Sequence, residues 1–153
     1  CHGAATPRQT AQACQMIAVD TGFLYALLDK RDAWHARAVA AAPTAQEGWV
    51  TTWPVLTEAT HLMARRLGSR FAQALMDEVA DGALLAWDVP KDQVARIPAM
   101  MQRYTSLPMD LADASLILLA EHLGHGRILT TDERDFGSYR WKSRKPFHNL
   151  LAQ

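Results

Sequence analysis

Cysteine is scarce in this 153-residue chain, and long apolar runs are missing. Both cysteines, Cys1 and Cys14, lie near the N-terminus, so the rest of the chain can hold neither a disulfide framework nor a cysteine zinc site. No apolar run is long enough to cross a bilayer. These absences argue against a disulfide-stapled secreted domain and a membrane-spanning protein, and they favour a cytoplasmic location.

The chain also lacks an excess of either charge. Sixteen Lys and Arg residues balance sixteen Asp and Glu residues, which gives a formal net charge of +0. A protein that coats nucleic acid usually carries a strong positive charge, so this class is disfavoured. A nuclease stays open, because the field at its site can differ from the overall balance.

Apolar residues make up 49% of the chain, which is ample for the core of one domain. Residues 1–15 are small and polar and lack any strand or helix period, so we interpret them as a leader or a disordered N-terminal segment. Met16 directly precedes an apolar run and is the expected natural start. The sequence therefore predicts a single domain over residues 16–153.

Short apolar runs alternate with helical patterns along that domain. Asp32 and Ser69 are the expected N-caps of the second and fourth helices, Pro54 suits the first turn of the third, and Pro98 should bend or break the fifth. No helix is predicted beyond Gly124, and an edge strand is expected near Phe147. Strands are predicted over 17–19, 49–52, 84–89 and 127–130, and helices over 23–28, 33–42, 54–67, 69–81, 91–104 and 110–124. This alternation predicts an α/β sandwich with a mostly parallel central sheet.

Four acidic residues stand where such a fold brings segments together. Asp20 and Asp132 each follow a predicted strand, while Glu58 and Asp113 are expected in the first turns of helices. Asp113 shares a helix face with Leu116, which is an unusual place for a surface carboxylate. Ligands of open α/β sheets bind beyond the carboxyl ends of the strands, so we expect all four at that edge.

Each acidic residue also has an ordinary interpretation. An Asp after a strand is often only a turn residue or a helix cap, and Asp110 is a natural N-cap for its helix. Glu58 could lie at the boundary of an apolar stripe, and Asp135 could belong to an exposed turn. The functional interpretation therefore depends on the ordered set.

Clustered carboxylates repel one another unless a counter-charge is present. A divalent cation supplies that charge, and oxygen ligands favour Mg²⁺ or Mn²⁺. Such an ion activates a bound water and stabilises a phosphodiester during displacement. No serine–histidine–acid arrangement or phosphate-binding glycine loop competes with this assignment.

The ordered segments resemble the PIN-domain family, and especially the VapC-type ribonuclease toxins of toxin–antitoxin pairs. The resemblance extends from Met16 to about Leu150 and rests on the following segments: Val19-Asp20-Thr21, Thr57-Glu58-Ala59, Asp110-Leu111-Ala112-Asp113-Ala114-Ser115 and Thr130-Thr131-Asp132-Glu133-Arg134-Asp135-Phe136. Each segment alone is a weak indicator of the family, whereas the four segments in this order and spacing are a specific one.

The resemblance implies a PIN-like α/β/α sandwich and a Mg²⁺- or Mn²⁺-dependent endoribonuclease. It implies that Asp20, Asp113 and Asp132 are metal ligands, directly or through water, and that Glu58 holds a metal-bound water or helps to deprotonate the nucleophile. Thr130 matches a position where the family often has a hydroxyl. Asp110 and Asp135 are expected to support the ligands. A homodimer and a small antitoxin that blocks the site are also implied.

RNA-binding candidates come from two basic stretches. Arg65 and Arg66 end the Glu58 helix, and a second group follows Tyr139: Arg140, Trp141, Lys142, Arg144 and Lys145. Trp141 could stack on a base or pack inward. Likewise, Trp34 and Phe71 could form a dimer or antitoxin surface, or belong to the core.

Two other functions stay open on the sequence alone. One is a PIN-like nuclease of RNA processing or structured DNA that has no antitoxin. The other is a nucleic-acid-binding or assembly module of the same fold that does not cut. The complete set of acidic residues disfavours the second.

Overall fold

A five-stranded parallel sheet forms the centre of the molecule. The computed structural model describes residues 15–42 and 47–152. The strands are β1 (Met16–Val19), β2 (Gly48–Thr52), β3 (Leu84–Trp87), β4 (Arg127–Leu129) and β7 (His148–Asn149), in the order β3-β2-β1-β4-β7. Every neighbouring pair is parallel. A separate antiparallel pair joins β5 (Arg140–Trp141) to β6 (Lys145–Pro146). The predicted α/β fold with a mostly parallel sheet is therefore confirmed.

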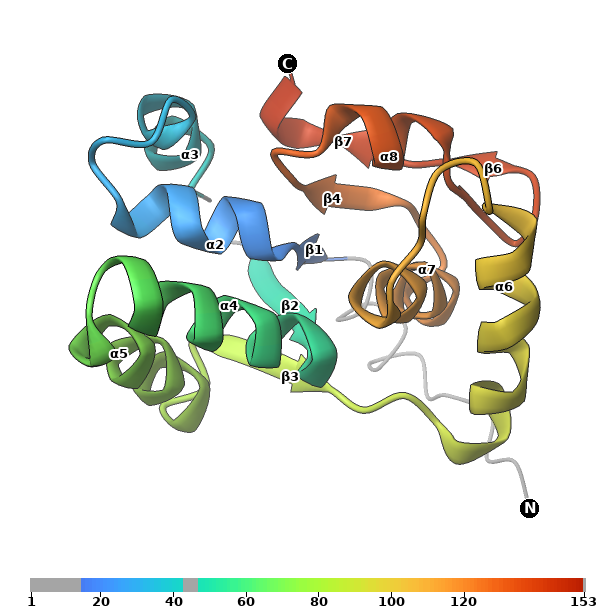
Figure 1. Ribbon diagram of the computed structural model, residues 1–153, viewed down its shortest axis with the longest axis horizontal. Helices are drawn as coiled ribbons and strands as arrows, with labels where there is room; N and C mark the ends of the chain where they lie inside the picture. The colour runs from blue at the N-terminus through green and yellow to red at the C-terminus, as the bar shows by residue number, and fades with distance from the viewer. Residues whose placement is uncertain (1–14, 43–46, 153) are drawn as a thin grey trace.

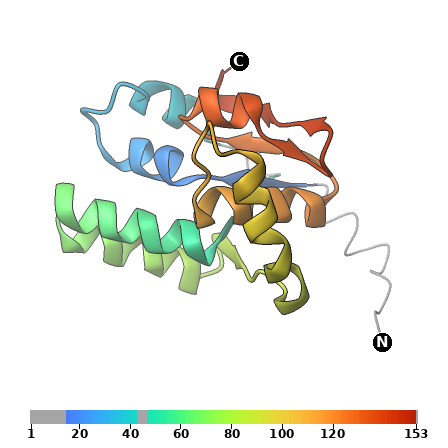
Figure 2. The same cartoon turned by 45° about the vertical axis from the view of Figure 1, so that its right-hand side comes forward.

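Helices cover both faces of this sheet (Figures 1 and 2). In Figure 1, α2 (Thr21–Leu28), α4 (Trp53–Arg66) and α5 (Ser69–Ala80) lie to the left, and α6 (Ile97–Arg103) and α7 (Leu111–Leu123) lie to the right. The remaining helical elements are α3 (His35–Ala41), α8 (Glu133–Ser138) and the 3₁₀ turns η1 (Lys91–Arg96) and η2 (Leu150–Ala152). The chain thus forms the expected three layers.

Local sequence chemistry sets both ends of α7. Asp110 is the N-cap, and its side chain and that of Asp113 exchange hydrogen bonds with each other's backbone N–H groups in a capping box. Gly124 ends the helix in the left-handed conformation, with φ of 79°, which glycine adopts without a steric penalty. Nine of the thirteen residues between them are buried, so α7 is a central helix of the core. The predicted helix is confirmed.

Pro54 lies in the first turn of α4, as the sequence predicts, and Thr52 is the N-cap. The Thr52 hydroxyl accepts a hydrogen bond from the Val55 N–H, and Pro54 occupies the first turn. The buried stripe contains Val55, Leu56, Ala59 and Met63. Glu58 is five residues beyond the start of α4, so it lies in the second turn. The expectation of a first-turn position was wrong.

The structure corrects three other local predictions. Trp34, not Asp32, is the N-cap of α3, and the Asp32 carboxylate accepts a hydrogen bond from the Trp34 N–H instead. Gly68, not Ser69, is the N-cap of α5. Helix α8 was not predicted at all. By contrast, the predicted helix over 91–104 is divided into η1, which ends at Arg96, and α6, which begins at Ile97. The break expected near Pro98 is therefore confirmed.

Several further predictions have limited outcomes. The predicted N-terminal segment covers residues 1–15, and residues 1–14 of it lie outside the described residues. The edge strand expected near Phe147 is found as β7, one residue later. Trp34 and Phe71 are half-buried and pack against the core. In the part of the chain that the structure describes, no helix is long and apolar enough to span a membrane.

Candidate active site

Asp20 and Asp132 lie next to each other because β1 and β4 are adjacent and parallel. The Asp20 N–H donates a hydrogen bond to the Leu129 carbonyl at 3.1 Å. The Thr130 hydroxyl donates to Asp20 Oδ2 at 2.8 Å and accepts from the Asp132 N–H at 3.0 Å. A single buried hydroxyl therefore orients Asp20 and fixes the backbone of Asp132. The structure thus brings Thr130 into contact with both predicted ligands.

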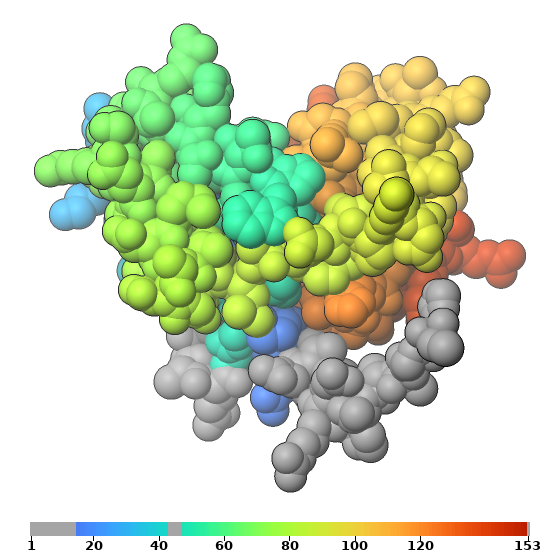
Figure 3. All heavy atoms as spheres, turned by 90° about the horizontal axis from the view of Figure 1, so that it is seen from below, coloured from blue at the N-terminus to red at the C-terminus, as the bar shows by residue number. Residues whose placement is uncertain are grey.

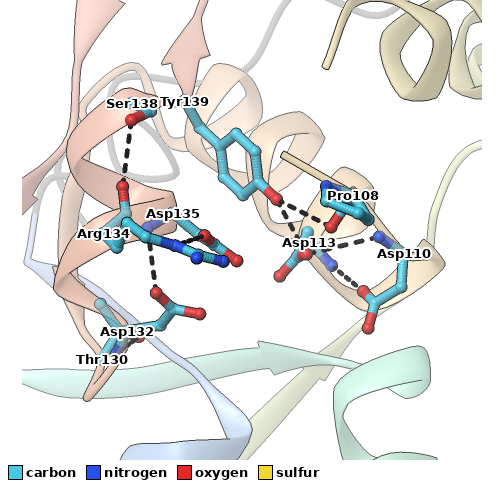
Figure 4. Close-up of polar contacts among 9 residues, drawn as sticks. All are labelled: Pro108, Asp110, Asp113, Thr130, Asp132, Arg134, Asp135, Ser138 and Tyr139. Carbon is cyan, nitrogen blue, oxygen red and sulfur yellow. Dashed lines mark hydrogen bonds and ion pairs between the residues drawn. The ribbon is translucent and has the colours of Figure 1, made fainter. Parts of the chain in front are cut away.

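Asp113 approaches the same edge of the sheet from the first turn of α7. Its N–H donates to Asp110 Oδ1 at 2.9 Å, while its Oδ2 accepts from the Asp110 N–H at 3.4 Å. The Tyr139 hydroxyl donates to the same Oδ2 at 3.2 Å (Figure 4). Sequence reasoning missed Tyr139, because a contact across 26 residues leaves no local pattern.

A buried hydroxyl pair connects α4, which carries Glu58, to α7. Thr52 Oγ1 lies 2.6 Å from Ser115 Oγ, and the Ser115 hydroxyl donates to the Ala112 carbonyl at 2.7 Å. Since the Ser115 proton is used there, Thr52 is the donor to Ser115. This bond joins the start of α4 to the first turns of α7. It therefore fixes the spacing between the helices that carry Glu58 and Asp113.

Those two helices also form the walls of a surface hollow. Figure 3 shows a notch between the green lobe of α4 and α5 and the yellow and orange lobe of α6 and α7. Glu58 is exposed on α4, and Asp113 is half-buried on α7. A polymer chain could therefore approach the carboxylates from solvent.

The carboxylates disfavour one another's ionised forms. The pKa of Asp20 is raised from 3.8 to about 6, chiefly by burial and also by the charges of Glu58 and Asp132, although hydrogen bonds from Thr130 and Thr21 oppose the rise. Burial, followed by the charges of Asp110 and Asp20, raises the pKa of Asp113 from 3.8 to about 7. The charged groups that act on both aspartates are thus other carboxylates.

The other two acidic residues follow the same trend. Burial and the charge of Asp110 raise the pKa of Glu58, while a hydrogen bond from Thr21 lowers it. Burial also raises the pKa of Asp132, and the neighbouring Asp135 adds to the rise. All four pKa values are therefore shifted in the direction that an added cation would reverse.

The donor set fits a hard divalent cation in its chemistry. Four carboxylates supply oxygen ligands only, as Mg²⁺ and Mn²⁺ prefer. Within residues 15–42 and 47–152, no three Asp, Glu, His or Cys side chains already stand close enough together to hold an ion. The carboxylates of Asp20, Asp113 and Asp132 would have to move closer together around it.

Asp135 belongs to the surroundings of the site and not to an exposed turn. Its side chain is buried, and its N–H donates to Asp132 Oδ1 at 2.9 Å, which caps α8. Arg134 Nε donates to Asp135 Oδ1 at 3.0 Å (Figure 4). The exposed-turn interpretation was therefore wrong. Asp135 supports Asp132 through the backbone and adds negative charge beside it.

Two residues of the basic segment after Tyr139 make hydrogen bonds within the protein. Trp141 is 5% exposed, and its Nε1 donates to the Pro146 carbonyl at 2.9 Å, so it cannot stack on a base. Nη1 of the Arg140 guanidinium donates to the carbonyls of Gly137, Ser138 and Tyr139. The remaining candidates are exposed, namely Arg65, Arg66, Lys142, Arg144 and Lys145.

An apolar cavity of about 400 Å³ lies away from the carboxylates, between α2, α5 and the first residues of β2. Leu24, Leu28, Trp49 and Leu75 are among its lining residues, and Glu47 at its border pairs with Arg127. Hydrolysis needs ionisable groups that face a substrate. We therefore assign the chemistry to the carboxylates and not to this cavity.

Comparison with known proteins agrees with the order of the acidic segments. The model of the PIN-domain family matches residues 17–142, a range that contains all four carboxylates. The chain belongs to the PIN-domain family. PIN-like architecture, with a mostly parallel sheet between helices, is thus established for this chain.

Two relatives from Mycobacterium tuberculosis illustrate the similarity. The chain is 26% identical over 122 residues to a protein named Ribonuclease VapC26, covering 80% of this chain and 90% of that protein. The crystal structure of VapC20, titled a sarcin–ricin loop cleaving toxin, superposes with a TM-score of 0.68 at 24% identity, covering 78% of this chain and 92% of that one. The second match concerns the fold alone.

Proposed function

We propose that this PIN-domain protein is a metal-dependent endoribonuclease and the toxin of a VapC-type toxin–antitoxin pair. The observation that carries the proposal is the convergence of Asp20, Asp113 and Asp132 at the carboxyl ends of β1 and β4. The pKa values of Asp20 and Asp113 rise to about 6 and about 7 because these groups are buried beside other carboxylates. The similarity to Ribonuclease VapC26 supports RNA as the substrate.

Asp20, Asp113 and Asp132 would hold Mg²⁺ or Mn²⁺, with Glu58 contributing through a water. The ion would supply charge neutralisation, a water with a lowered pKa and stabilisation of the phosphodiester charge. Carboxylates with raised pKa values bind such an ion in competition with protons. We therefore expect metal binding to weaken as the pH falls below about 6 to 7, where Asp20 and Asp113 become protonated.

The chain's own residues would carry out orientation and proton transfer. Thr130 holds one Asp20 oxygen at 2.8 Å, which leaves the carboxylate in a fixed orientation before any ligand arrives. Glu58 is exposed toward solvent and has a raised pKa, so it suits the acceptance of a proton from an attacking water. Asp110 would hold Asp113 through the capping box.

Exposed cations would bind the RNA backbone around this centre. Lys142, Arg144 and Lys145 project from the β5–β6 turn region, and Arg65 and Arg66 end α4. A homodimer could extend the groove, since a single chain has no net positive charge to attract RNA. A cytoplasmic location is expected for a protein that acts on cellular RNA.

A small antitoxin would block the site by replacing the charge of the metal. An antitoxin arginine could donate paired hydrogen bonds to the carboxylates, because its planar guanidinium matches their geometry. A structure of the complex tests this point. An antitoxin that leaves Asp20, Asp113 and Asp132 open to solvent would contradict the proposed mode of inhibition.

Cleavage of a panel of tRNA and rRNA fragments tests the proposed activity. The panel should include a sarcin–ricin loop hairpin, and each RNA is incubated with Mg²⁺, Mn²⁺ or EDTA. We expect metal-dependent cutting by the wild type, loss in Asp20→Asn and Asp113→Asn, and full activity in Asp77→Asn. Asp77 is a suitable control because it is an exposed carboxylate on α5, outside the cluster.

The other outcomes separate the alternatives. Cutting that survives EDTA and both substitutions would contradict the metal mechanism. RNA binding without cutting would favour a module of the same fold that does not cleave. Cutting by a chain that has no antitoxin encoded beside it would favour an RNA-processing nuclease.

A further inference from the structure

Tyr139 places a phenol hydroxyl against a predicted metal ligand. The ring is fully buried, and its hydroxyl lies 3.2 Å from Asp113 Oδ2 and 3.5 Å from the Pro108 carbonyl oxygen. A phenol has one proton to donate. The carboxylate is both the nearer acceptor and, when ionised, the stronger one, so the proton belongs mainly to the bond with Asp113.

Aromatic neighbours hold this hydroxyl in place. Tyr104 and Phe136 contact the Tyr139 ring edge-to-face, with ring centroids 5.0 and 5.4 Å away. The Tyr104 hydroxyl accepts a hydrogen bond from the Arg140 N–H at 3.0 Å, which ties this cage to the segment that follows Tyr139. The ring therefore has little freedom to turn its hydroxyl away from α7 (Figure 4).

Both hydrogen bonds to the Asp113 carboxylate meet the same oxygen. Tyr139 and the Asp110 N–H donate to Oδ2, at 3.2 and 3.4 Å. Neither of them engages Oδ1. A carboxylate that is held through one oxygen cannot rotate freely about its last bond, so the other oxygen keeps a defined direction.

We propose that Tyr139 is a positioning residue, which orients the Asp113 carboxylate so that Oδ1 remains available to the divalent cation. The inference deepens the proposed function and rests on it, because it takes Asp113 as a ligand. Tyr139 touches neither RNA nor metal in this account. Its effect is transmitted through Asp113, and it should therefore appear in the affinity for metal before any RNA is added.

A purely structural role is the alternative. A buried tyrosine can fill the core and satisfy its hydroxyl wherever an acceptor is near. In that case the loss of the hydroxyl would change stability slightly and leave the metal affinity unchanged. Tyr104 offers a matched control, since it belongs to the same aromatic cage and its hydroxyl contacts the Arg140 N–H and not Asp113.

The experiment compares Tyr139→Phe with Tyr104→Phe in the full chain. Both variants keep their rings and lose one hydroxyl. Calorimetric titration with Mn²⁺ in the absence of RNA should show an affinity about tenfold weaker for Tyr139→Phe, the usual order for losing a hydrogen bond to a metal ligand. Tyr104→Phe should stay within about twofold of the wild type, because its hydroxyl does not touch a ligand. Thermal unfolding checks that both variants fold.

The same titration of Asp113→Asn distinguishes a failure of the role of Tyr139 from a failure of the proposed metal centre. Equal Mn²⁺ affinities for folded Tyr139→Phe, Tyr104→Phe and wild type, together with lost binding in Asp113→Asn, would overturn the role of Tyr139 alone. A wild type that binds no Mn²⁺, or an Asp113→Asn variant that binds it normally, would overturn the proposed metal centre and this inference with it. Selective weakening in Tyr139→Phe supports the proposal.

Discussion

Replacing Asp20 with asparagine should stabilise the metal-free protein. Asp20 is 8% exposed, and burial is the largest cause of the rise of its pKa from 3.8 to about 6. Asparagine keeps an oxygen that can accept the hydrogen bond from the Thr130 hydroxyl, which now lies 2.8 Å from Asp20 Oδ2. Its amide group would replace Oδ1, which now accepts a hydrogen bond from the Thr21 N–H at 2.6 Å. The substitution therefore removes the buried charge at the cost of that one hydrogen bond.

The sign follows from the protonation of the two states. The unfolded chain loses the Asp20 proton near its ordinary pKa of 3.8, whereas the folded chain keeps it up to about 6. The folded state thus binds more protons between these values, and the free energy of unfolding falls as the pH rises through this window. At about pH 8 the full penalty is present and amounts to roughly 3 kcal/mol. The loss of the Thr21 hydrogen bond offsets about 1 to 2 kcal/mol of it, so Asp20→Asn should gain about 1 to 2 kcal/mol.

Urea denaturation in EDTA measures this gain directly. The wild type and Asp20→Asn are compared at about pH 8, where the carboxyl is ionised in both states, and at about pH 4, where most of the difference should vanish. Added Mn²⁺ should stabilise the wild type and should not stabilise the variant to the same extent, because a ligand that binds only the folded state raises its stability.

Asp29 provides the matched control. It is also 8% exposed, but hydrogen bonds from Arg31, followed by one from Tyr25, lower its pKa to about 2. Its carboxylate stabilises the fold at all pH values above about 4, and this contribution is lost as the pH falls toward 2. Asp29→Asn should therefore destabilise the protein at about pH 8. If Asp20→Asn destabilises it as well, the reasoning about unneutralised charge is refuted.

Three further variants test the surroundings of the site. Thr130→Val should weaken Mn²⁺ binding or RNA cleavage about 10- to 100-fold, because it removes the hydroxyl that orients Asp20, and an unchanged titration would contradict this role. Trp141→Ala should lower the free energy of unfolding by about 3 to 5 kcal/mol, as expected for a buried indole, and a stable variant with altered RNA selectivity would instead revive the stacking interpretation. Joint replacement of Arg144 and Lys145 by glutamine should weaken RNA binding. If both side chains contact single-stranded phosphates, the slope of log K against log salt concentration should fall in magnitude by about 1.4. An unchanged slope would place the RNA elsewhere.

The sequence predicted those parts of the fold that local chemistry determines. Asp110 and Gly124 bound α7 because an N-cap carboxylate and a left-handed glycine act over a few residues. The strands that precede Asp20 and Asp132 were found because short apolar runs with turn residues after them are typical of buried parallel strands. These two strands and α7 place three of the four carboxylates, and the order of the acidic segments supplied the resemblance to the PIN family.

The missed features depend on contacts between distant segments. Helix α8 has six residues, including Gly137, and is too short for a helical period to appear in the sequence. Strand β5 has two residues, so no alternation could tell whether Trp141 points inward. The bond from Tyr139 to Asp113 joins segments 26 residues apart, and they come together because β5, which directly follows Tyr139, packs against α7.

The central claim is that Asp20, Asp113 and Asp132 hold a divalent cation, and anomalous scattering from crystals soaked in Mn²⁺ tests it most directly. The account predicts a manganese peak between these carboxylates at the carboxyl ends of β1 and β4, and no such peak in crystals of Asp113→Asn. A manganese peak elsewhere, or an ordered cluster without manganese at neutral pH, would contradict the claim.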